Sequence, residues 1–422
     1  MKRSTASVLG MQARQPLLAA VLIIGLAGGV TTAATPAGWP AFQGPLGSGG
    51  ATLAFSNLGE RSIVWRVDLP GRGLSTPLVI GDQVIVTCSG GPQQDRLSLV
   101  CLDATTGNRQ WERQLWATGR TMCHNKTSVA APTPCSDGGR IYALFSSNDL
   151  VCLDLNGDLI WLRGITADYP NVSNSLGMSS SLVVTEGVVV AQVENDSESY
   201  ALGIDALTGE NRWRLDRPKA ANWTSPAVLA QGIVGLQSKT GVDAVRVADG
   251  KSVWQYDGGA STIPSSCRLG QLLFVPSHGL TALSLADGED GKPKQLWRSS
   301  RLSPGTPSPV AAGETVFTIS RGDVLTAGQI TDGERRWQLR LKGPFSATPV
   351  VLGERLLAVS ETGLVQLIGF TESEAEVVGT LDLEDEVLAS PAVGEDGVFL
   401  RSNTTLWKLR GSESGPASST DR

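Results

Sequence analysis

The sequence predicts an all-β protein: an eight-bladed β-propeller of four-stranded antiparallel blades, with the last blade closed by an N-terminal strand. Three observations lead to this prediction: a tryptophan that recurs every 40 to 52 residues, a Ser-Pro or Thr-Pro marker ahead of apolar segments, and a spare tryptophan-bearing segment before the first marker. The 422 residues are 41% hydrophobic, which is enough for a large core. All-β closed folds run long as single domains, so the length does not require several domains.

The recurring tryptophans follow turns rich in Asp, Asn and Gly, such as residues 102–107 before Trp111. Asp closes such turns through side-chain hydrogen bonds, and Gly supplies a positive φ. A tryptophan at one position of every outer strand is most simply a docking residue between blades, and its indole N–H should find a backbone acceptor. We assign this structural role to Trp65, Trp111, Trp161, Trp213, Trp254, Trp297 and Trp337. Trp39, Trp116, Trp223 and Trp407 lie outside the series and are free for other roles.

The Ser-Pro and Thr-Pro pairs mark the first strand of each repeat, because proline is tolerated at the first residue of a strand. A Gly turn, a second apolar strand and a third strand follow before the Asp/Gly turn. Radial stacking of such sheets buries both faces and leaves only short edges. Eight outer strands can be counted: seven carry a tryptophan, and the eighth is a degenerate copy near Val377 and Val378. The inner strands also number eight, and they fall at residues 77, 134, 181, 226, 266, 309, 349 and 391.

The last repeat contains only three strands, which start at Ser390, Val398 and Thr405. Its missing outer strand is supplied by residues 62–67, which carry Trp65 ahead of the first inner strand. We therefore expect Trp65 to lie beside the segment around Leu409, so that the two ends of the chain share blade eight.

The chain divides into an export signal at 1–34, a leader segment at 35–61, the propeller at 62–410 and a tail of disordered composition at 411–422. A basic start, an apolar run at 17–30 and the small residues 32–34 are typical of a signal peptide. The run is short for a membrane span of roughly 20 residues, and an uncleaved anchor is the alternative. We expect export to the periplasm or cell envelope, with no integral membrane span after cleavage.

The charge of the protein weighs against two classes of partner. The net charge is −6, and removing residues 1–34, which carry three basic and no acidic side chains, leaves −9. A strongly acidic chain gains no bulk electrostatic attraction to nucleic acid or anionic lipid. We expect no nucleic-acid partner, and we expect a monomer.

The six cysteines permit three disulfides, with 15 complete pairings. Cys88 and Cys101 flank a Gly-rich loop on neighbouring predicted strands and are the favoured pair. The alternative is that the cysteines are small buried hydrophobic residues. The sequence contains no Cys-x-x-Cys, so neither a redox motif nor covalent haem is indicated.

The Ser-x-Pro inner strand, followed by Leu-Asp-x-x-Thr-Gly and Trp, resembles the tryptophan-docking repeat of pyrroloquinoline-quinone (PQQ) type propellers. The opening 38–45, Gly-Trp-Pro-Ala-Phe-Gln-Gly-Pro, is similar to the leader of exported bacterial PQQ-like proteins of the outer-membrane assembly factor type. The resemblance covers roughly residues 60–409. It implies a non-catalytic scaffold that binds an envelope protein or another macromolecule, although the same ring also serves quinoprotein dehydrogenases.

The enzyme alternative, a PQQ-dependent alcohol or sugar dehydrogenase, matches the sequence poorly. Such enzymes have two adjacent cysteines over the quinone and a Ca²⁺ held by Glu, Asn and Asp. No two cysteines are adjacent here, and no carboxylates can be assigned to those roles. Two histidines leave little for a zinc site. We expect no catalytic residue, no metal site and no cofactor, with PQQ and Ca²⁺ as the alternative.

Residues just before the Ser-Pro and Thr-Pro markers should line the central axis of the ring. A cation beside an aromatic platform could bind an anionic or planar ligand, whereas the alternative is a set of solvated loop residues. A third reading is a polysaccharide-binding ring, for which Trp116 and Trp223 are the cue. The candidate axial residues are Arg72, His124, Asn125, Lys126, Asn222 and Trp223.

Overall fold

The computed structural model describes residues 38–411 except 46, 174–175 and 287–291. These residues belong to a compact unit at 36–422. The predicted export signal at 1–34 and the tail from residue 412 lie outside the described residues. In the described part, the only helices are the short 3-10 turns η1 (Glu60–Ser62) and η2 (Ile165–Ala167), and neither could cross a membrane.

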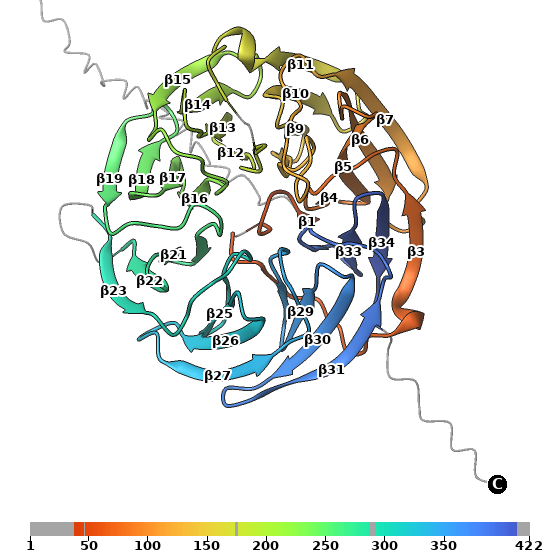
Figure 1. Ribbon diagram of the computed structural model, residues 1–422, viewed down its shortest axis with the longest axis vertical. Helices are drawn as coiled ribbons and strands as arrows, with labels where there is room; N and C mark the ends of the chain where they lie inside the picture. Colours follow the sequence, from red (N-terminus) through yellow and green to blue (C-terminus); the bar gives the residue numbers. More distant parts are fainter. Residues whose placement is uncertain (1–37, 46, 174–175, 287–291, 412–422) are drawn as a thin grey trace, which may run out of the picture. The chain divides into compact units, whose positions relative to one another are not determined.

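Eight sheets are arranged radially as the blades of a propeller, which confirms the predicted fold class (Figure 1). In blades 1 and 2, from the inner to the outer strand, these are β4 (Leu78–Ile80), β5 (Gln83–Gly90), β6 (Arg96–Asp103), β7 (Arg109–Trp116), then β8 (Cys135–Ser136), β9 (Arg140–Leu144), β10 (Asp149–Asp154), β11 (Leu159–Gly164). In blades 3 and 4 they are β12 (Val183–Thr185), β13 (Val188–Val193), β14 (Tyr200–Asp205), β15 (Asn211–Asp216), then β16 (Ala227–Ala230), β17 (Ile233–Ser238), β18 (Gly241–Arg246), β19 (Ser252–Tyr256).

The second half of the ring repeats the same order. In blades 5 and 6 the strands are β20 (Cys267–Leu269), β21 (Leu272–Pro276), β22 (Leu280–Ser284), β23 (Lys294–Ser299), then β24 (Val310–Ala312), β25 (Thr315–Ile319), β26 (Val324–Gln329), β27 (Arg335–Arg340). In blades 7 and 8 they are β28 (Val350–Leu352), β29 (Arg355–Val359), β30 (Leu364–Phe370), β31 (Ala375–Asp382), then β32 (Ala392–Val393), β33 (Val398–Arg401), β34 (Thr405–Leu409), β3 (Ile63–Asp68).

Blade 8 is closed by the N-terminal strand, as the sequence predicts. β3 pairs antiparallel with β34, and the register sets Ile63 opposite Leu409 and Trp65 opposite Lys408. Because β3 and the last strand, β34, belong to one sheet, opening the ring between blade 8 and blade 1 requires breaking strand pairing as well as packing.

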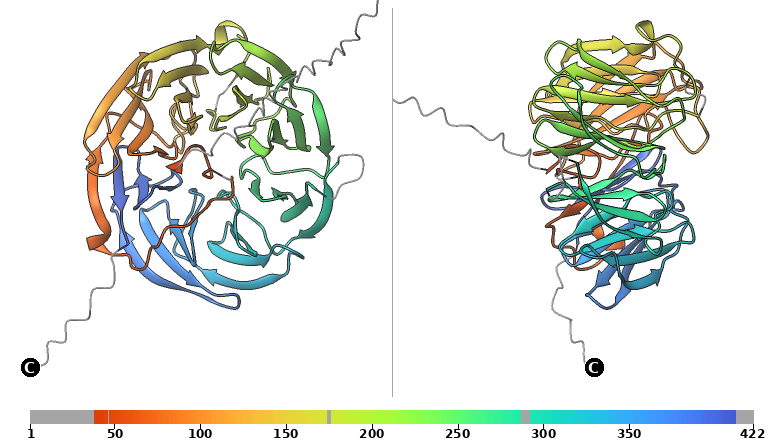
Figure 2. Two further views of the ribbon diagram at one scale, coloured as in Figure 1. Left: turned by 180° about the vertical axis from the view of Figure 1, so that it is seen from behind. Right: turned by 90° about the vertical axis from the view of Figure 1, so that its left-hand side faces the viewer.

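The leader segment adds two short strands at the centre of the ring. β1 (Gly38–Trp39) pairs antiparallel with β4 of blade 1, and β2 (Gly50–Ala51) pairs parallel with β28 of blade 7. Seen from behind, the segment between them lies inside the ring (Figure 2). Trp39 is only 2% exposed, so this tryptophan, like the equally buried Trp407, is a core residue rather than one free for another role.

Six of the seven docking tryptophans reach the turn between the third and fourth strands of the next blade, and the corresponding turn for Trp254 includes residues outside the described part of the chain. The Nε1–H of Trp111 donates to the carbonyl of Leu155 at 3.0 Å, and the equivalent bond of Trp297 to Ile330 measures 2.8 Å. The same bond joins Trp65 to Ala104, Trp161 to Ala206, Trp213 to Val247 and Trp337 to Thr371. The indole also covers the turn glycine: a Cβ on Gly333, whose φ is +72°, would lie 2.5 Å from the ring of Trp297.

Small residues opposite the tryptophans explain several of the cysteines. Cys101 pairs with Trp111 on the neighbouring strand, and Cys152 pairs with Trp161. The equivalent partner of Trp297 in blade 5 is Ala282. A bulky side chain at this position would compete with the indole for space. Two more cysteines, at 135 and 267, begin inner strands, where other blades carry valine, leucine or alanine. These cysteines therefore serve as small core residues.

The predicted Cys88–Cys101 disulfide is wrong, because all six cysteines are free thiols. The two residues do lie on neighbouring strands, but Cys88 pairs with Ser98 and Cys101 with Ile85. An odd offset along a strand places side chains on opposite faces of the sheet. Accordingly, Cys88 packs in the core between blades 8 and 1, whereas Cys101 packs between blades 1 and 2.

Blade 7 lacks a tryptophan, and its degenerate position is Gly379 rather than Val377 or Val378. Gly379 pairs with Leu367 just before the bulge that follows the tryptophan pair in other blades. The missing side chain is replaced by the leader, since the Cβ of Leu58 lies 3.1 Å from the Cβ position of Gly379. Val377 and Val378 are instead 38% and 41% exposed.

Candidate functional site: an axial cup

The centre of the ring holds a cavity of about 330 Å³, which we call the axial cup. Its wall contains one serine or threonine from each blade, two positions before the first residue of the inner strand. These eight residues are Thr76, Thr133, Ser181, Ser225, Ser265, Ser308, Thr348 and Ser390. The positions counted in the sequence follow these wall residues by one, except in blade 3, where the counted Ser181 is itself the wall residue.

The wall residues are joined to one another by a nearly complete ring of hydrogen bonds. The backbone N–H of Thr76 donates to the hydroxyl oxygen of Thr133 at 3.0 Å, and that of Thr133 donates to Ser181 at 3.2 Å. The same bond continues from blade to blade through Ser225, Ser265, Ser308, Thr348 and Ser390, at 2.9 to 3.1 Å. The marker hydroxyls therefore fix the spacing of adjacent blades at the axis.

The leader segment lies across the axis and supplies the side chain of Phe42 to the lining of the cup. Its backbone bonds to blades on several sides of the ring: Pro40 accepts from Ser136 at 2.9 Å, and Gly47 accepts from Arg268 at 2.9 Å. Gly49 accepts from Val351, also at 2.9 Å. The N–H donors of these bonds, Ser136, Arg268 and Val351, lie within the inner strands, so the described part of the leader is held against the inner strands of three blades.

The opposite side of the cup is its mouth, which is lined by the loops that lead into the inner strands. On one side of the mouth the loops of blades 2 to 5 contact one another. His124 N–H donates to the carbonyl of Leu176 at 3.2 Å, and the N–H of Trp223 donates to Thr262 at 2.9 Å. Leu176 and Ile263 line the cup and remain 47% and 40% exposed, which makes this side apolar.

The other side of the mouth, near blades 7, 8, 1 and 2, is polar. Lys126 Nζ forms an ion pair with Glu361 at 2.7 Å, and Ser346 donates to the same carboxylate at 2.7 Å. Burial opposes ionisation of Glu361, but the hydrogen bonds from Lys126 and Ser346 hold its pKa below the ordinary value. The pair is therefore charged at neutral pH and has no net charge.

The structure brings three of the six predicted axial residues into the cup: His124, Lys126 and Trp223. The other three lie beside it and do not line it. Arg72 bonds to the carbonyl of Asn125 and, at 2.9 Å, to Asn403 of blade 8. Sequence reasoning missed Phe42 and the hydroxyl ring, although the repeated Ser/Thr of the markers was a usable signal for the latter.

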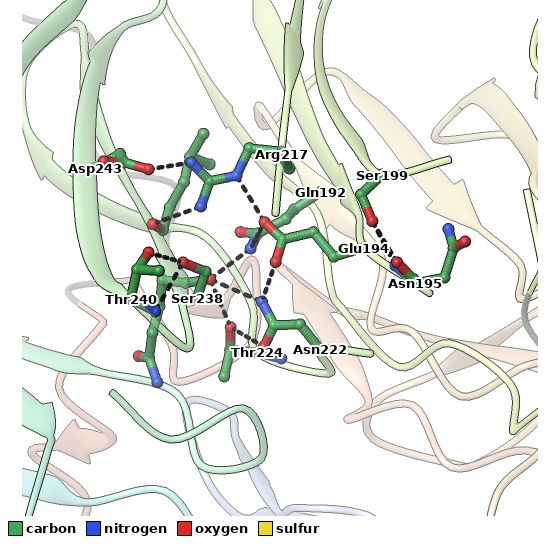
Figure 3. Close-up of polar contacts among 12 residues, drawn as sticks. Gln192, Glu194, Asn195, Ser199, Arg217, Asn222, Thr224, Ser238, Thr240 and Asp243 are labelled. Carbon is green, nitrogen blue, oxygen red and sulfur yellow. Dashed lines mark hydrogen bonds and ion pairs between the residues drawn. The ribbon is translucent and has the colours of Figure 1, made fainter. Parts of the chain in front are cut away.

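Asn222 belongs to a buried polar network next to the cup (Figure 3). Its side-chain amide donates to Glu194 at 2.9 Å and to the carbonyl of Gln237 at 2.8 Å. Arg217 donates to the other oxygen of Glu194 at 2.6 Å and also pairs with Asp243. Burial raises the pKa of Glu194 despite the nearby guanidinium. The network ties the segment that carries Trp223 to blades 3 and 4.

The described residues offer little catalytic chemistry. Burial raises the pKa of Cys101 and of Cys152 to about 12, so neither thiol is a nucleophile at neutral pH. No cluster of three or more His, Cys, Asp or Glu side chains suited to a metal ion occurs in the described part of the chain. The titratable side chains that line the cup are His124 and Lys126.

The repeat and the docked tryptophans define the class of protein, an eight-bladed propeller of the PQQ-like type. Residues 15–177, 172–274 and 277–405 match the family described as outer membrane protein assembly factor BamB, and the chain belongs to this family. BamB of Moranella endobia (strain PCIT) is 26% identical over 205 residues, which make up 47% of this chain and 48% of that protein. The match thus spans about half the length of this curated relative.

Solved structures share the fold at low identity. BamB from Moraxella catarrhalis superimposes with a TM-score of 0.61 at 15% identity, covering 84% of this chain and 99% of that one. A europium-containing methanol dehydrogenase gives 0.67 at 11% identity, covering 90% and 99%. Quinohemoprotein alcohol dehydrogenase from Comamonas testosteroni gives 0.66 at 13%, covering 91% and 82%. At these identities the likeness concerns the fold alone.

The lining of the cup does not fit a hard cation such as Ca²⁺. Hard cations are held by several oxygen ligands, with carboxylates prominent among them. The residues that line the cup include no Asp or Glu, and the nearby Glu361 is already paired with Lys126. Seven of the eight wall hydroxyl oxygens already accept one backbone N–H from a neighbouring blade.

Proposed function

We propose that this protein is a non-catalytic scaffold of the bacterial cell envelope that binds a protein partner during assembly of the outer membrane. Membership of the BamB family supports this role, because the curated relative is an outer membrane protein assembly factor. The family match over residues 15–405 is the observation that carries the proposal. Export by the predicted signal at 1–34 would bring the chain to the cell envelope, which this role requires.

The mouth face offers the surface for a protein partner. Its loops expose Met122, Leu176 and Ile263 to 54%, 47% and 40%. These loops are connected: the Cβ of Cys123 lies 2.8 Å from the Cβ position of Gly177, next to Leu176. Exposed apolar side chains gathered on one face, next to polar groups, are typical of a protein-binding surface. A rigid ring held by docked tryptophans would present them without a large ordering cost.

Complementation tests this proposal. A strain of the native host that lacks this protein should contain less outer-membrane protein, and the wild-type chain should restore it. A variant with Met122→Ser, Leu176→Ser and Ile263→Ser should restore less than a third of the difference, because the apolar contact surface is removed. Quantitative mass spectrometry of outer-membrane fractions measures the outcome.

The matched control changes three apolar residues on the outer strands, Val253→Ser, Leu296→Ser and Val378→Ser, which are exposed to a similar extent. This variant should complement like the wild type. Both variants must show the wild-type thermal unfolding transition. The proposal is contradicted if deletion leaves the outer-membrane proteins unchanged, or if the two variants fail equally.

A further inference from the structure

We propose that the axial cup binds a neutral saccharide unit of one or two sugar rings, either the end of a glycan chain or a free disaccharide. This inference is independent of the protein-binding role proposed above. It rests on three features of the described residues: the hydroxyl ring, the charge balance of the lining and the aromatic side chains.

The hydroxyl ring offers donors to a ligand at the axis. A serine or threonine hydroxyl has one donor and two acceptor positions. In the wall, seven hydroxyl oxygens accept a backbone N–H from the preceding blade. Within the described part of the chain, none of these hydroxyls donates to another protein group. Each O–H is therefore available to a ligand oxygen, and several converge on one small volume.

The charge balance of the cup favours a neutral ligand over an anion. Lys126 is the cation of the lining, and Glu361 lies 2.7 Å from its ammonium group. An anionic ligand would have to compete with this carboxylate. Nδ1 of His124 accepts the N–H of Lys126 at 3.1 Å, so a neutral imidazole carries its proton on Nε2. The other polar side chains of the lining are serine and threonine hydroxyls, which suit hydroxyl groups better than carboxylates or phosphates.

The aromatic side chains suit the apolar faces of a sugar ring. Trp223 and Phe42 both line the cup, and the indole plane is fixed because its Nε1–H donates to the carbonyl of Gly177 at 3.1 Å. A pocket that combines aromatic walls with a few placed polar groups is typical of small-molecule sites. At about 330 Å³ the cup lies at the small end of such sites.

The buried network of Figure 3 positions Trp223 for this contact. Asn222 precedes the tryptophan and is held by Glu194, which in turn is held by Arg217 at 2.6 Å. Their side chains are nearly inaccessible, with 4% exposed for Arg217 and 1% for Glu194. Neither Glu194 nor Arg217 lines the cup, so both act on the ligand through Trp223 and are positioning residues. Preorganisation of the aromatic contact lowers the entropy cost of binding.

Isothermal titration calorimetry of the full-length mature chain tests the proposal directly. The probes are cellobiose, maltose, lactose and N,N′-diacetylchitobiose, with digalacturonic acid as the anionic comparison. We expect at least one neutral disaccharide to bind with a dissociation constant below 10 mM and digalacturonic acid to bind at least tenfold more weakly. Trp223→Ala should weaken binding at least tenfold. Ser308→Ala should weaken it severalfold, because one converging donor is lost.

Trp116→Ala is the matched control, since this side chain is 65% exposed and lies outside the cup; it should bind like the wild type. Glu194→Gln keeps the size of the side chain but weakens the hold on Asn222, so it should lower the affinity for the disaccharide severalfold. Arg217→Lys should lower this affinity to a similar extent. A glycan array separates the two sources of ligand. Binding of immobilised chains through a free non-reducing end identifies a glycan, and binding of soluble disaccharides alone identifies a free sugar.

Three results would overturn the proposal: no neutral disaccharide of the panel binds below 10 mM, digalacturonic acid binds more tightly, or a folded Trp223→Ala protein binds like the wild type. The last comparison requires that Trp223→Ala retain the wild-type thermal transition. If that variant does not fold, transferred saturation from the aromatic and hydroxyl-bearing wall to the sugar, measured by NMR on the wild type, decides the question. The two proposals can fail separately. The complementation test with the Met122→Ser, Leu176→Ser and Ile263→Ser variant measures outer-membrane protein, whereas calorimetry of the wild-type chain measures sugar binding.

Discussion

The junction between blades 7 and 8 differs from the junctions closed by tryptophan. Elsewhere an indole of one blade docks on the Asp/Gly turn of the next, as Trp297 does on Gly333. In blade 8 that turn does not exist, because its third strand ends at Leu409 and its fourth begins at Ile63. A docking tryptophan on blade 7 would have no turn to reach, and Leu58 packs at Gly379 instead. The repeat is thus lost at the one place where the chain closes on itself.

Removing a docking tryptophan should cause the largest loss of stability. Trp297 is 8% exposed, and Trp297→Ala removes its packing together with the bond to Ile330. We expect a loss of about 3–5 kcal/mol in the free energy of unfolding, measured by equilibrium denaturation in urea. Trp116→Ala, a change at an exposed tryptophan, should cost less than about 0.5 kcal/mol. Equal losses in the two variants would contradict the docking role.

The turn glycine beneath the indole should be the next most sensitive position. Gly333→Ala places a Cβ 2.5 Å from the ring of Trp297 at a φ of +72°. The strained backbone and the displaced indole should together cost about 1–3 kcal/mol. Gly353 has a φ of +58° but open space around its Cβ position, so Gly353→Ala measures the backbone cost alone. If Gly353→Ala is as destabilising as Gly333→Ala, the contact with the indole contributes nothing.

The stability of the junction between blades 7 and 8, which has no tryptophan, should depend less on the side chain that packs there, Leu58. Leu58 is only partly buried against the core cluster of blades 7, 8 and 1. Leu58→Ala should therefore cost about 1–2 kcal/mol, less than the full burial of a leucine would imply. The same urea titration gives this value. A loss as large as that of Trp297→Ala would mean that the two kinds of junction are equally strong.

Acid should weaken the docking turns through their aspartates. Asp205 accepts hydrogen bonds from Arg212 and from the N–H groups of Thr208 and Leu207, and these lower its pKa to about 2. A carboxyl whose pKa is depressed on folding adds stability above about pH 4 that is lost as the pH falls towards 2. Asp205→Asn should be less stable at neutral pH, with a shallower loss between pH 4 and 2. An unchanged acid profile would show that this carboxylate does not support the turn.

The smallest expected effect is that of PQQ with Ca²⁺, because the cup lining contains no carboxylate to hold the metal. Adding both to the purified protein should change neither the absorption spectrum nor the rate of dye reduction with simple alcohols or aldoses. Dye reduction above the protein-free control would make the protein a quinoprotein dehydrogenase.

Most of the fold could be predicted from the sequence because it repeats. The features that the sequence analysis did not predict are those that occur only once. Markers such as Ser308-Pro309 predicted the inner strands, but only the curvature of the ring shows that their hydroxyls meet at the axis. The leader occurs once, so nothing in the pattern could place Phe42 in the cup. The Glu194–Arg217 network joins residues that follow two different strands, β13 and β15, and no spacing rule predicts it. Gly379 was missed because a bulge shifts the register beside Val377 and Val378.

The central claim, that the ring is a framework and the mouth face is the working surface, is tested most directly by site-specific photo-crosslinking in the native host. p-Benzoylphenylalanine is placed at Met122 on the mouth face and, in a second strain, at Val253 on an outer strand. The account predicts that a defined adduct with an envelope protein forms from position 122 and not from position 253. Adducts from position 253 alone, or none from position 122, would contradict it.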